Sequence, residues 1–296
     1  MKTYLIGLLA FAHASSAWAA TTINSVNKFA YGANLGWMDW RGDTNNGAVI
    51  GDFVCSGFIY AANVGWIHLG GNAPANGIRY LNNSATDYGV NHDGKGNLSG
   101  YAYGANIGWV SFTNNTATGA LSATDVPQVD LKTGRLSGFA YSANCGWISL
   151  SNAFAFVQTD TISFTDSDGD GISDNWERLH FPNLTTATAS TDSDGDGQTD
   201  KQEYFADTDP LNAQDFLRIT NVTLNVAGNL TTISWPSKET RCYQVLERTD
   251  LLTGSYTNSG LGLFTPDAGS STSRNVSDGV TSNRFFKVEA KRPLVP

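Results

Sequence analysis

The sequence predicts a mainly β protein built from three successive parts. Charged residues make up only 15% of the chain, and Gly, Ser, Thr and Asn are abundant, a composition that favours strands and turns over long helices. An aromatic pattern recurs four times in the first half, and most acidic residues gather in the middle. We expect a leader at 1–20, a β-meander repeat domain at 21–157, an acidic connector with short helices at 158–215, and a β-sandwich at 216–296.

The first residues indicate export. Lys2 precedes a short apolar run at residues 4–11 and a small-x-small triplet at residues 17–19, which is the order of a secretory signal peptide. The run is shorter than the about 20 residues that a membrane-spanning helix needs. We expect cleavage near Ala19 or Ala20 and a secreted or cell-surface protein without a membrane span. The alternative is a buried N-terminal helix.

The repeat in the first half centres on an Asn-x-Gly-Trp motif. Its tryptophans are Trp37, Trp66, Trp109 and Trp147, spaced 29, 43 and 38 residues apart. The flanking residues alternate like half-buried strands, and Asn and Gly tolerate the positive φ of a tight hairpin. Each unit is predicted to be a three-stranded meander. Because one meander cannot bury its aromatic face, four units should stack as a solenoid, a prism or a small propeller.

Two interpretations of the four tryptophans are open. A core role is preferred, since one strictly placed Trp per repeat suits packing, and it predicts equivalent buried positions. The alternative is a carbohydrate-binding surface, because flat aromatic faces suit sugar rings. Over residues 29–150 the pattern resembles the aromatic Asn-x-Gly-Trp-Ile repeats of exported bacterial proteins, a resemblance that names no function.

The acidity of the chain belongs to one segment. The net charge is −9, yet residues 160–215 hold 14 of the 27 acidic residues and only two of the 18 basic ones. The remainder is close to neutral. This distribution argues against a generally acidic surface and against nucleic acid as a partner.

Two segments, residues 166–177 and 192–203, match the calcium-loop pattern D-x-D-x-D-G-x5-E at every position. Carboxylates at positions 1, 3 and 5 of a tight loop converge on one point, and Gly at position 6 permits the bend. Position 7 offers a backbone carbonyl, and position 9 contributes directly or through a water molecule. Glu at position 12 completes the coordination shell. The predicted Ca²⁺ ligands are Asp166, Asp168, Asp170, Ile172, Asp174 and Glu177 in the first loop, and Asp192, Asp194, Asp196, Gln198, Asp200 and Glu203 in the second.

Paired EF-hands are not expected, because the segments before both loops are β-branched or follow Pro182 and are poor helix formers. Short exiting helices are predicted at residues 174–181 and 200–206. The two loops and the trailing Asp-Pro-Leu-Asn at 209–212 resemble bacterial thrombospondin type 3 repeats. That resemblance implies acidic loops folded around calcium with little apolar core, and makes Asp207 and Asp209 further candidate metal ligands.

The C-terminal 80 or so residues read as strands at 217–224, 231–236, 243–248 and 284–290, separated by turn-rich stretches. This pattern predicts an immunoglobulin- or fibronectin-type-III-like sandwich. Trp235 and Tyr243 are expected in its core.

Three cysteines are present: Cys55, Cys145 and Cys242. An odd count does not suit a disulfide scaffold. One Cys55–Cys145 bridge and three unpaired thiols are both open.

Motifs of common enzymes are missing from the sequence: it has no Gly-x-Ser-x-Gly, no His-Glu-x-x-His and no phosphate loop. The densest carboxylates are already assigned to calcium, so we expect no enzyme. The main hypothesis is an exported, adhesive or structural surface or matrix protein in which calcium rigidifies the connector. The alternative is a carbohydrate-binding module protein that uses the repeat aromatics. Expected partners are calcium and an extracellular polysaccharide or another surface protein.

Overall fold

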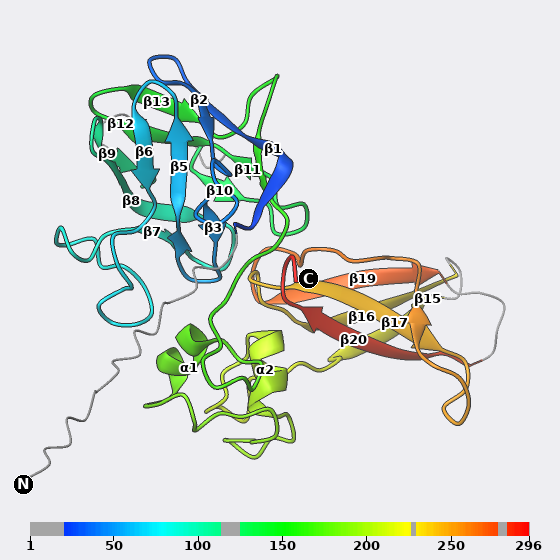
Figure 1. The fold of residues 1–296 in the computed structure, drawn as a ribbon. Coiled ribbons are helices and arrows are strands. Elements are labelled where there is room, and N and C mark those ends of the chain that lie inside the picture. The colour runs from blue at the N-terminus through cyan, green and yellow to red at the C-terminus, as the bar shows by residue number, and fades with distance from the viewer. Residues whose placement is uncertain (1–20, 114–124, 226–228, 278–282, 296) are drawn as a thin grey trace, which may run out of the picture.

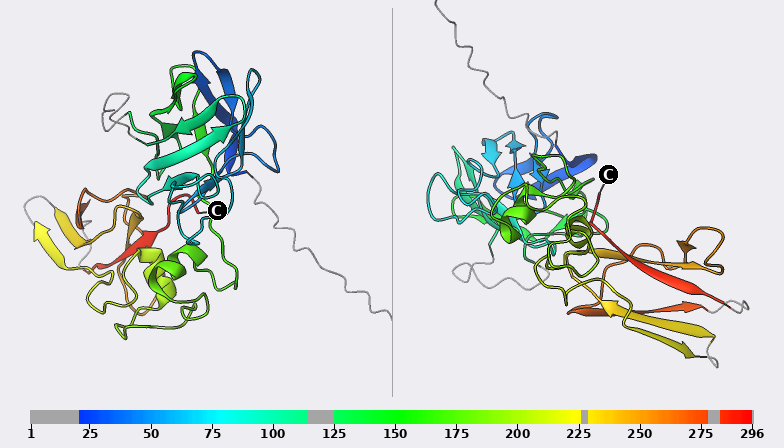
Figure 2. Two further views of the ribbon diagram at one scale, coloured as in Figure 1. Left: turned by 90° about the vertical axis from the view of Figure 1, so that its left-hand side faces the viewer. Right: turned by 90° about the horizontal axis from the view of Figure 1, so that it is seen from below.

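The computed structural model describes residues 21–113, 125–225, 229–277 and 283–295, and the predicted signal peptide lies outside this range. The described chain is mainly β, as predicted, with two short helices. A barrel-like sheet, a pair of smaller sheets, and a helical segment beside both make up the molecule (Figures 1 and 2). Within the described residues, none of the helices has the length and apolarity needed to cross a membrane.

Four antiparallel hairpins form the barrel. Each contains one repeat, and their strands are β1 (Ile23–Gly32) with β2 (Gly36–Asp39), β5 (Phe58–Ala61) with β6 (Gly65–His68), β8 (Leu98–Gly104) with β9 (Gly108–Ser111), and β12 (Phe139–Ser142) with β13 (Gly146–Ser149). Neighbouring hairpins pair in order, and β1 pairs with β13, with Tyr31 opposite Ser149, so these eight strands close. The expected solenoid, prism or propeller is therefore wrong: the units share one closed sheet.

The barrel interior is filled in layers by equivalent residues of the four repeats. The residue after each repeat tryptophan is buried and aliphatic or Met: Met38, Ile67, Val110 and Ile148. Two positions further on, a second buried layer consists of Trp40, Leu69, Phe112 and Leu150. At the hairpin-turn end, the residue between Asn and Gly packs on this core: Leu35, Val64, Ile107 and Cys145. Small residues such as Ala30 and Ala102 on the facing strands leave room for these side chains.

A ring of four hydrogen bonds closes the turn end of the barrel. The side-chain amide of each repeat asparagine donates to the backbone carbonyl of a neighbouring turn: Asn63 to Leu35 at 3.0 Å, Asn106 to Val64 at 2.9 Å, Asn144 to Ile107 at 3.0 Å, and Asn34 to Cys145 at 3.1 Å. The last of these bonds joins the first hairpin to the fourth. We call these four residues the asparagine ring. It explains why the repeat specifies Asn as well as Gly at the turn.

The four repeat tryptophans lie on the outside of the barrel, which corrects the expectation that they form its core. Trp37, Trp66, Trp109 and Trp147 occupy equivalent positions, as expected, but are 48%, 45%, 45% and 39% exposed. Successive residues of a strand point to opposite faces, so a buried residue at the next position forces the indole outward. Each indole contacts the tyrosine opposite it, as Trp109 does with Tyr103 at a ring-centroid distance of 5.0 Å.

The predicted third strand of each meander is found only in part. β7 (Val90–His92) pairs with β8, but β3 (Val49–Ile50) with β4 (Cys55–Ser56) and β10 (Gln128–Val129) with β11 (Leu136–Ser137) form separate short ladders. A glycine with positive φ separates β11 from β12: Gly138 has φ 83°, and a Cβ there would lie 2.0 Å from the Val126 carbonyl oxygen. β14 (Val157–Thr159) pairs with β1.

Two three-stranded antiparallel sheets follow the helical segment. One contains β15 (Asn221–Asn225), β16 (Leu230–Pro236) and β19 (Ser271–Ser277); the other contains β17 (Cys242–Arg248), β18 (Thr257–Asn258) and β20 (Phe285–Lys291). Both contribute to one buried cluster, in which Trp235 and Tyr243 are 0% and 1% exposed, as expected for core residues. β19 was not predicted from the sequence, because its only large apolar residue is Val276.

The three cysteines are free in the structure. Cys55 is buried in β4, and Cys145 lies in a turn at the barrel end. The Cys55–Cys145 bridge does not form, so three unpaired thiols is the alternative that applies.

Candidate calcium centre

Two equivalent loop–helix units occupy the segment between barrel and paired sheets. The first loop leads into α1 (Asp174–His180) and the second into α2 (Asp200–Ala206), within a residue of the predicted helices. The same backbone bond closes each loop: the amide of Asp174 donates to Thr165 and that of Asp200 to Thr191, both at 2.8 Å. Within the described residues no helix leads directly into either loop, since α1 ends at His180 and residues 181–191 are not helical, as expected for loops that are not EF-hands.

Positions 1, 3 and 5 of each loop come together as predicted. Asp166, Asp168 and Asp170 each offer an oxygen within 4.8 Å of the others, and Asp192, Asp194 and Asp196 do the same. The first Asp also shapes its loop: the two carboxylate oxygens of Asp166 accept the amides of Gly169 at 2.7 Å and Gly171 at 2.9 Å. Gly171 has φ 88° there, which explains the glycine at position 6.

The position-12 glutamates are the most informative groups of the site. Glu177 is 0% and Glu203 1% exposed, and neither carboxylate oxygen of Glu177 has a hydrogen-bond partner within the described residues. Burial, followed by the nearby Asp168 and Asp170 carboxylates, raises the pKa of Glu177 to about 8. Burial and Asp194 raise the pKa of Glu203 to the same value. A buried carboxylate beside three others needs a cation or a proton.

The position-9 aspartates are hydrogen-bonded to position 2 of their loops. The two oxygens of Asp174 accept the backbone amide of Ser167 at 2.7 Å and its hydroxyl at 2.6 Å. Asp200 accepts the same two groups of Ser193, at 3.0 and 2.9 Å. Both aspartates are buried, and they hold position 2 of the loop against the start of the helix. The sequence pattern alone does not show whether an aspartate at position 9 binds the metal or holds the loop through hydrogen bonds.

The remaining candidate ligands lie as follows. Ile172 is buried in a small apolar cluster next to its loop, and Gln198 lines a groove beside α2. Asp207 lies apart from the loop clusters, because its carboxylate accepts the Thr240 hydroxyl and pairs with Arg241 at 3.3 Å. Asp209 lies 3.7 Å from His180 Nδ1. Neither trailing aspartate belongs to the two clusters of three aspartates.

Several residues that anchor the centre were missed by the sequence analysis. Trp176 and Tyr204, from α1 and α2, are buried together with Ile172, and Phe53 of the barrel packs against their cluster. Arg241, the residue before β17, donates to the carbonyls of Tyr204 at 2.6 Å and Phe205 at 2.9 Å. No local pattern marks such isolated residues, because their partners are distant in sequence.

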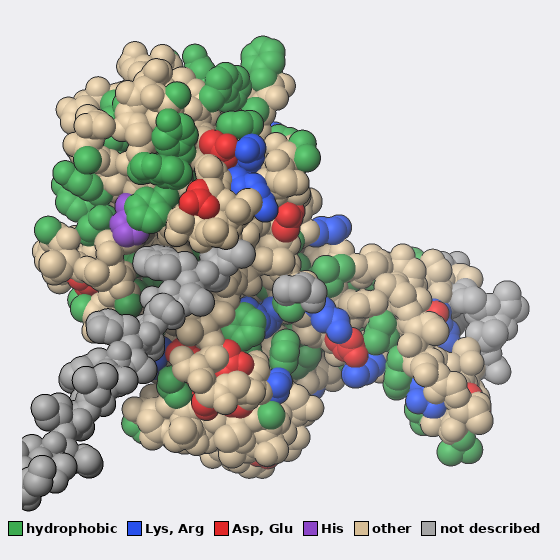
Figure 3. All heavy atoms as spheres, viewed as in Figure 1, with side chains coloured by type: hydrophobic (Ala, Val, Ile, Leu, Met, Phe, Trp, Pro, Cys, Tyr) green, Lys and Arg blue, Asp and Glu red, His purple; other side chains and the backbone are tan. Residues whose placement is uncertain are grey.

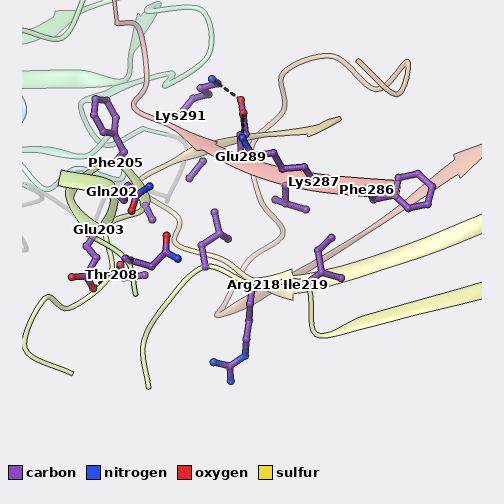
Figure 4. Close-up of a pocket in the computed structure, with 15 residues that line it drawn as sticks. Gln202, Glu203, Phe205, Thr208, Arg218, Ile219, Phe286, Lys287, Glu289 and Lys291 are labelled. Carbon is purple, nitrogen blue, oxygen red and sulfur yellow. Dashed lines mark hydrogen bonds and ion pairs between the residues drawn. The ribbon is translucent and has the colours of Figure 1, made fainter. Parts of the chain in front are cut away.

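The two loops also contact each other and the paired sheets. Lys201 Nζ donates to the Asp170 carbonyl at 2.6 Å, which links α2 to the first loop. A groove of about 470 Å³ separates α2 from β20, with Gln202 and Glu203 on one side and Glu289 on the other (Figure 4). The second loop thus lies directly beside the C-terminal sheets.

Residues 166–180 and 192–213 match the protein family Bacterial TSP3 repeat. Comparisons with curated proteins and with solved structures find no match for the chain. The family match begins at Asp166, the first predicted ligand, and covers the second loop, α2 and the trailing aspartates. It confirms the thrombospondin type 3 repeat prediction for this segment.

Proposed function

We propose that the chain is an exported, calcium-binding surface or matrix protein without catalytic activity, in which calcium stiffens the joint between the barrel and the paired sheets. One observation carries the proposal: Glu177 and Glu203 are buried without sufficient partners, each beside three clustered aspartates. Oxygen donors in this number suit Ca²⁺, a hard cation that takes six to eight of them. The family match supports the same ion.

Contacts on both sides of the loops support a role for calcium at the joint. Tyr204 directly follows Glu203, and the guanidinium of Arg292, beyond β20, lies 4.9 Å from its ring centroid. On the barrel side, the Asn175 amide of α1 donates to the Ile78 carbonyl at 2.7 Å. An ion that fixes the two glutamates would therefore fix both helices against their neighbours. The adhesive or structural role rests on this geometry and on the leader-like first residues.

Calorimetric titration of the mature chain tests the proposal. We expect about two Ca²⁺ ions per chain, with dissociation constants near 10⁻⁴–10⁻³ M or somewhat tighter, as in extracellular modules. Glu177→Gln with Glu203→Gln should abolish both sites. Glu289→Gln is the matched control, because Glu289 lies across the groove from α2 and outside the loops. Absence of calcium heat, or equal preference for Mg²⁺, would overturn the proposal.

A further inference from the structure

The outer face of the barrel carries a belt of exposed aromatic rings. Each hairpin contributes one tyrosine and one tryptophan, all 39% exposed or more except Tyr141: Tyr31, Trp37, Tyr60, Trp66, Tyr103, Trp109, Tyr141 and Trp147. Figure 3 shows hydrophobic side chains gathered on this face of the barrel. Exposed aromatic surface of this extent on a folded protein marks a binding site more often than chance. The closed core does not use these rings.

A hollow of about 420 Å³ lies beside Trp109. Three rings line it, since Tyr88 contacts Trp109 at a centroid distance of 4.8 Å and 85°, and Tyr101 at 6.1 Å and 72°. The other side consists of Asn82, Asn83 and Ser84, from the loop before the hairpin. Asn83 is exposed, and its side-chain amide makes no hydrogen bond within the described residues. The hollow thus combines flat apolar rings with uncharged hydrogen-bonding groups.

The neighbouring hairpin repeats this arrangement. A hollow of about 240 Å³ lies between Phe58 and Trp66, whose rings make the same contact as Tyr101 and Trp109, at 6.1 Å and 79°. Its polar side consists of Asn46 and of the Asp43 carboxylate, which accepts the Asn45 backbone amide and the Asn46 side-chain amide, so unlike the first hollow it carries one acidic group; both residues again come from the loop before the hairpin. β6 pairs directly with β8, so the two hollows are on adjacent hairpins of one surface.

We propose that the two hollows are subsites for a neutral polysaccharide that runs across the outer face of the barrel. The C–H groups on one face of a sugar ring pack on the negative face of an aromatic ring, while amide and hydroxyl groups bond its hydroxyls. No Lys or Arg lines either hollow, which disfavours an anionic ligand. Both hollows are open to the surface, as a long chain requires. The proposal does not depend on the calcium loops.

Affinity gel electrophoresis with soluble neutral glucans, mannans, xylans and galactans, and alginate as the charged comparison, tests it with the full mature chain. At least one neutral polysaccharide should retard the protein and change its tryptophan fluorescence, with and without chelator. Trp109→Ala should weaken binding at least about tenfold, as loss of an aromatic anchor does. Trp37→Ala is the matched control, since Trp37 occupies the same hairpin position but lines neither hollow; its affinity should stay within about twofold.

Asn83→Ala keeps the proposal testable if Trp109→Ala does not fold, because this exposed side chain supports no structural hydrogen bond; it should weaken binding several-fold. The proposal is overturned if no neutral polysaccharide binds the folded chain. It also fails if Trp37→Ala loses as much affinity as Trp109→Ala, or if both hollow variants bind like the unmodified chain. Self-association that Trp109→Ala abolishes, without polysaccharide binding, would assign the face to a second copy instead.

Discussion

The asparagine ring gives each repeat asparagine a long-range role. The side-chain amide of Asn106, in the turn of the third hairpin, donates to the carbonyl of Val64, 42 positions earlier in the chain. A backbone carbonyl at a barrel end otherwise depends on water, and the ring replaces water with a neighbouring hairpin. The glycine of each motif is required by the backbone of the turn: Gly36, Gly65, Gly108 and Gly146 have φ of 77°, 80°, 70° and 81°, a region that other residues rarely adopt.

Asn106→Ala should therefore lower the free energy of unfolding by about 1 kcal/mol, the usual net value of a hydrogen bond to an uncharged carbonyl. Chemical denaturation of the mature chain checks this. Asn83→Ala, which removes an exposed amide without such a bond, should leave the midpoint unchanged. Equal midpoints for the Asn106 and Asn83 variants would show that the ring contributes nothing to stability.

Glu177 and Glu203 make calcium binding depend on pH. The pKa of each carboxyl is raised from 4.5 to about 8 in the fold, so without calcium each holds a proton at neutral pH. A raised carboxyl pKa contributes stability that is present at low pH and lost as pH rises through about 8. Calcium must displace this proton, so apparent affinity should fall by up to about tenfold per pH unit below 8 at each loop.

Calcium titrations at pH 6, 7 and 8 should show affinity rising with pH. Melting curves of the calcium-free protein at the same pH values should show its stability falling with pH. The Glu177→Gln, Glu203→Gln variant should lose both trends. Equal calcium affinity at pH 6 and pH 8 would contradict the assignment of these glutamates as ligands.

At the scale of the element, consecutive residues of each hairpin point to opposite faces of the barrel wall, one to the outer surface and the next to the interior. Trp147 is 39% exposed, whereas Ile148 is 1% exposed within the barrel. The alternation was predictable from the sequence, but which set of residues faces the barrel interior was not. Both faces carry large apolar residues, and the choice between them depends on closure, which buries Trp40 and leaves Trp37 outside.

Ile148→Ala should destabilise the barrel by about 2–5 kcal/mol, because it creates a cavity among layered side chains. Trp147→Ala should cost clearly less, since a large part of its surface is already in water. Urea denaturation of the two single variants gives the comparison. If Trp147→Ala lowered the free energy of unfolding more than Ile148→Ala, the tryptophans would have to be interpreted as core residues after all.

The two short helices show what local pattern can and cannot predict. Pro182 after α1 and the loop glutamates defined both helices to within a residue. α2 has a capping box, in which Thr199 accepts the Gln202 amide at 3.3 Å and Gln202 accepts the Thr199 amide at 2.8 Å. Ser173 before α1 forms no such side-chain bond. Helices of seven residues are marginal alone, so packing on Phe53 and Arg241 must supplement the caps, and no sequence motif marks those partners.

At the scale of the whole molecule, barrel, loops and paired sheets meet in one joint. The barrel and the paired sheets also contact each other directly, without the loops: Lys95 of the barrel forms an ion pair with Glu239 of the sheet region at 2.8 Å. The order of the three parts along the chain followed from composition and charge. Closure of the barrel did not, because the pairing of β1 with β13 is remote in sequence and no local pattern marks it.

Removing calcium should loosen this joint while the barrel and the paired sheets, each with its own buried cluster, stay folded. The clustered aspartates of each loop, no longer neutralised by an ion, would then repel one another and open the loops, and residues 185–190 should become susceptible to protease. Limited proteolysis and small-angle scattering, with and without chelator, measure this. Glu177→Gln with Glu203→Gln should behave like the chelated protein, and Glu289→Gln like the unmodified one. An unchanged radius together with an uncut segment would make calcium incidental to the architecture.

The asparagine ring also limits how this repeat array can evolve. An open array gains or loses units one at a time, because each unit contacts only its neighbours. Here the fourth hairpin bonds back to the first, so a fifth unit would widen the barrel, separate the layered side chains and break the ring. Repeat number is therefore fixed at the four hairpins of the closed sheet. The starting hairpin is not fixed in this way: a circular permutant that begins at β5 would keep every layer and every bond of the ring.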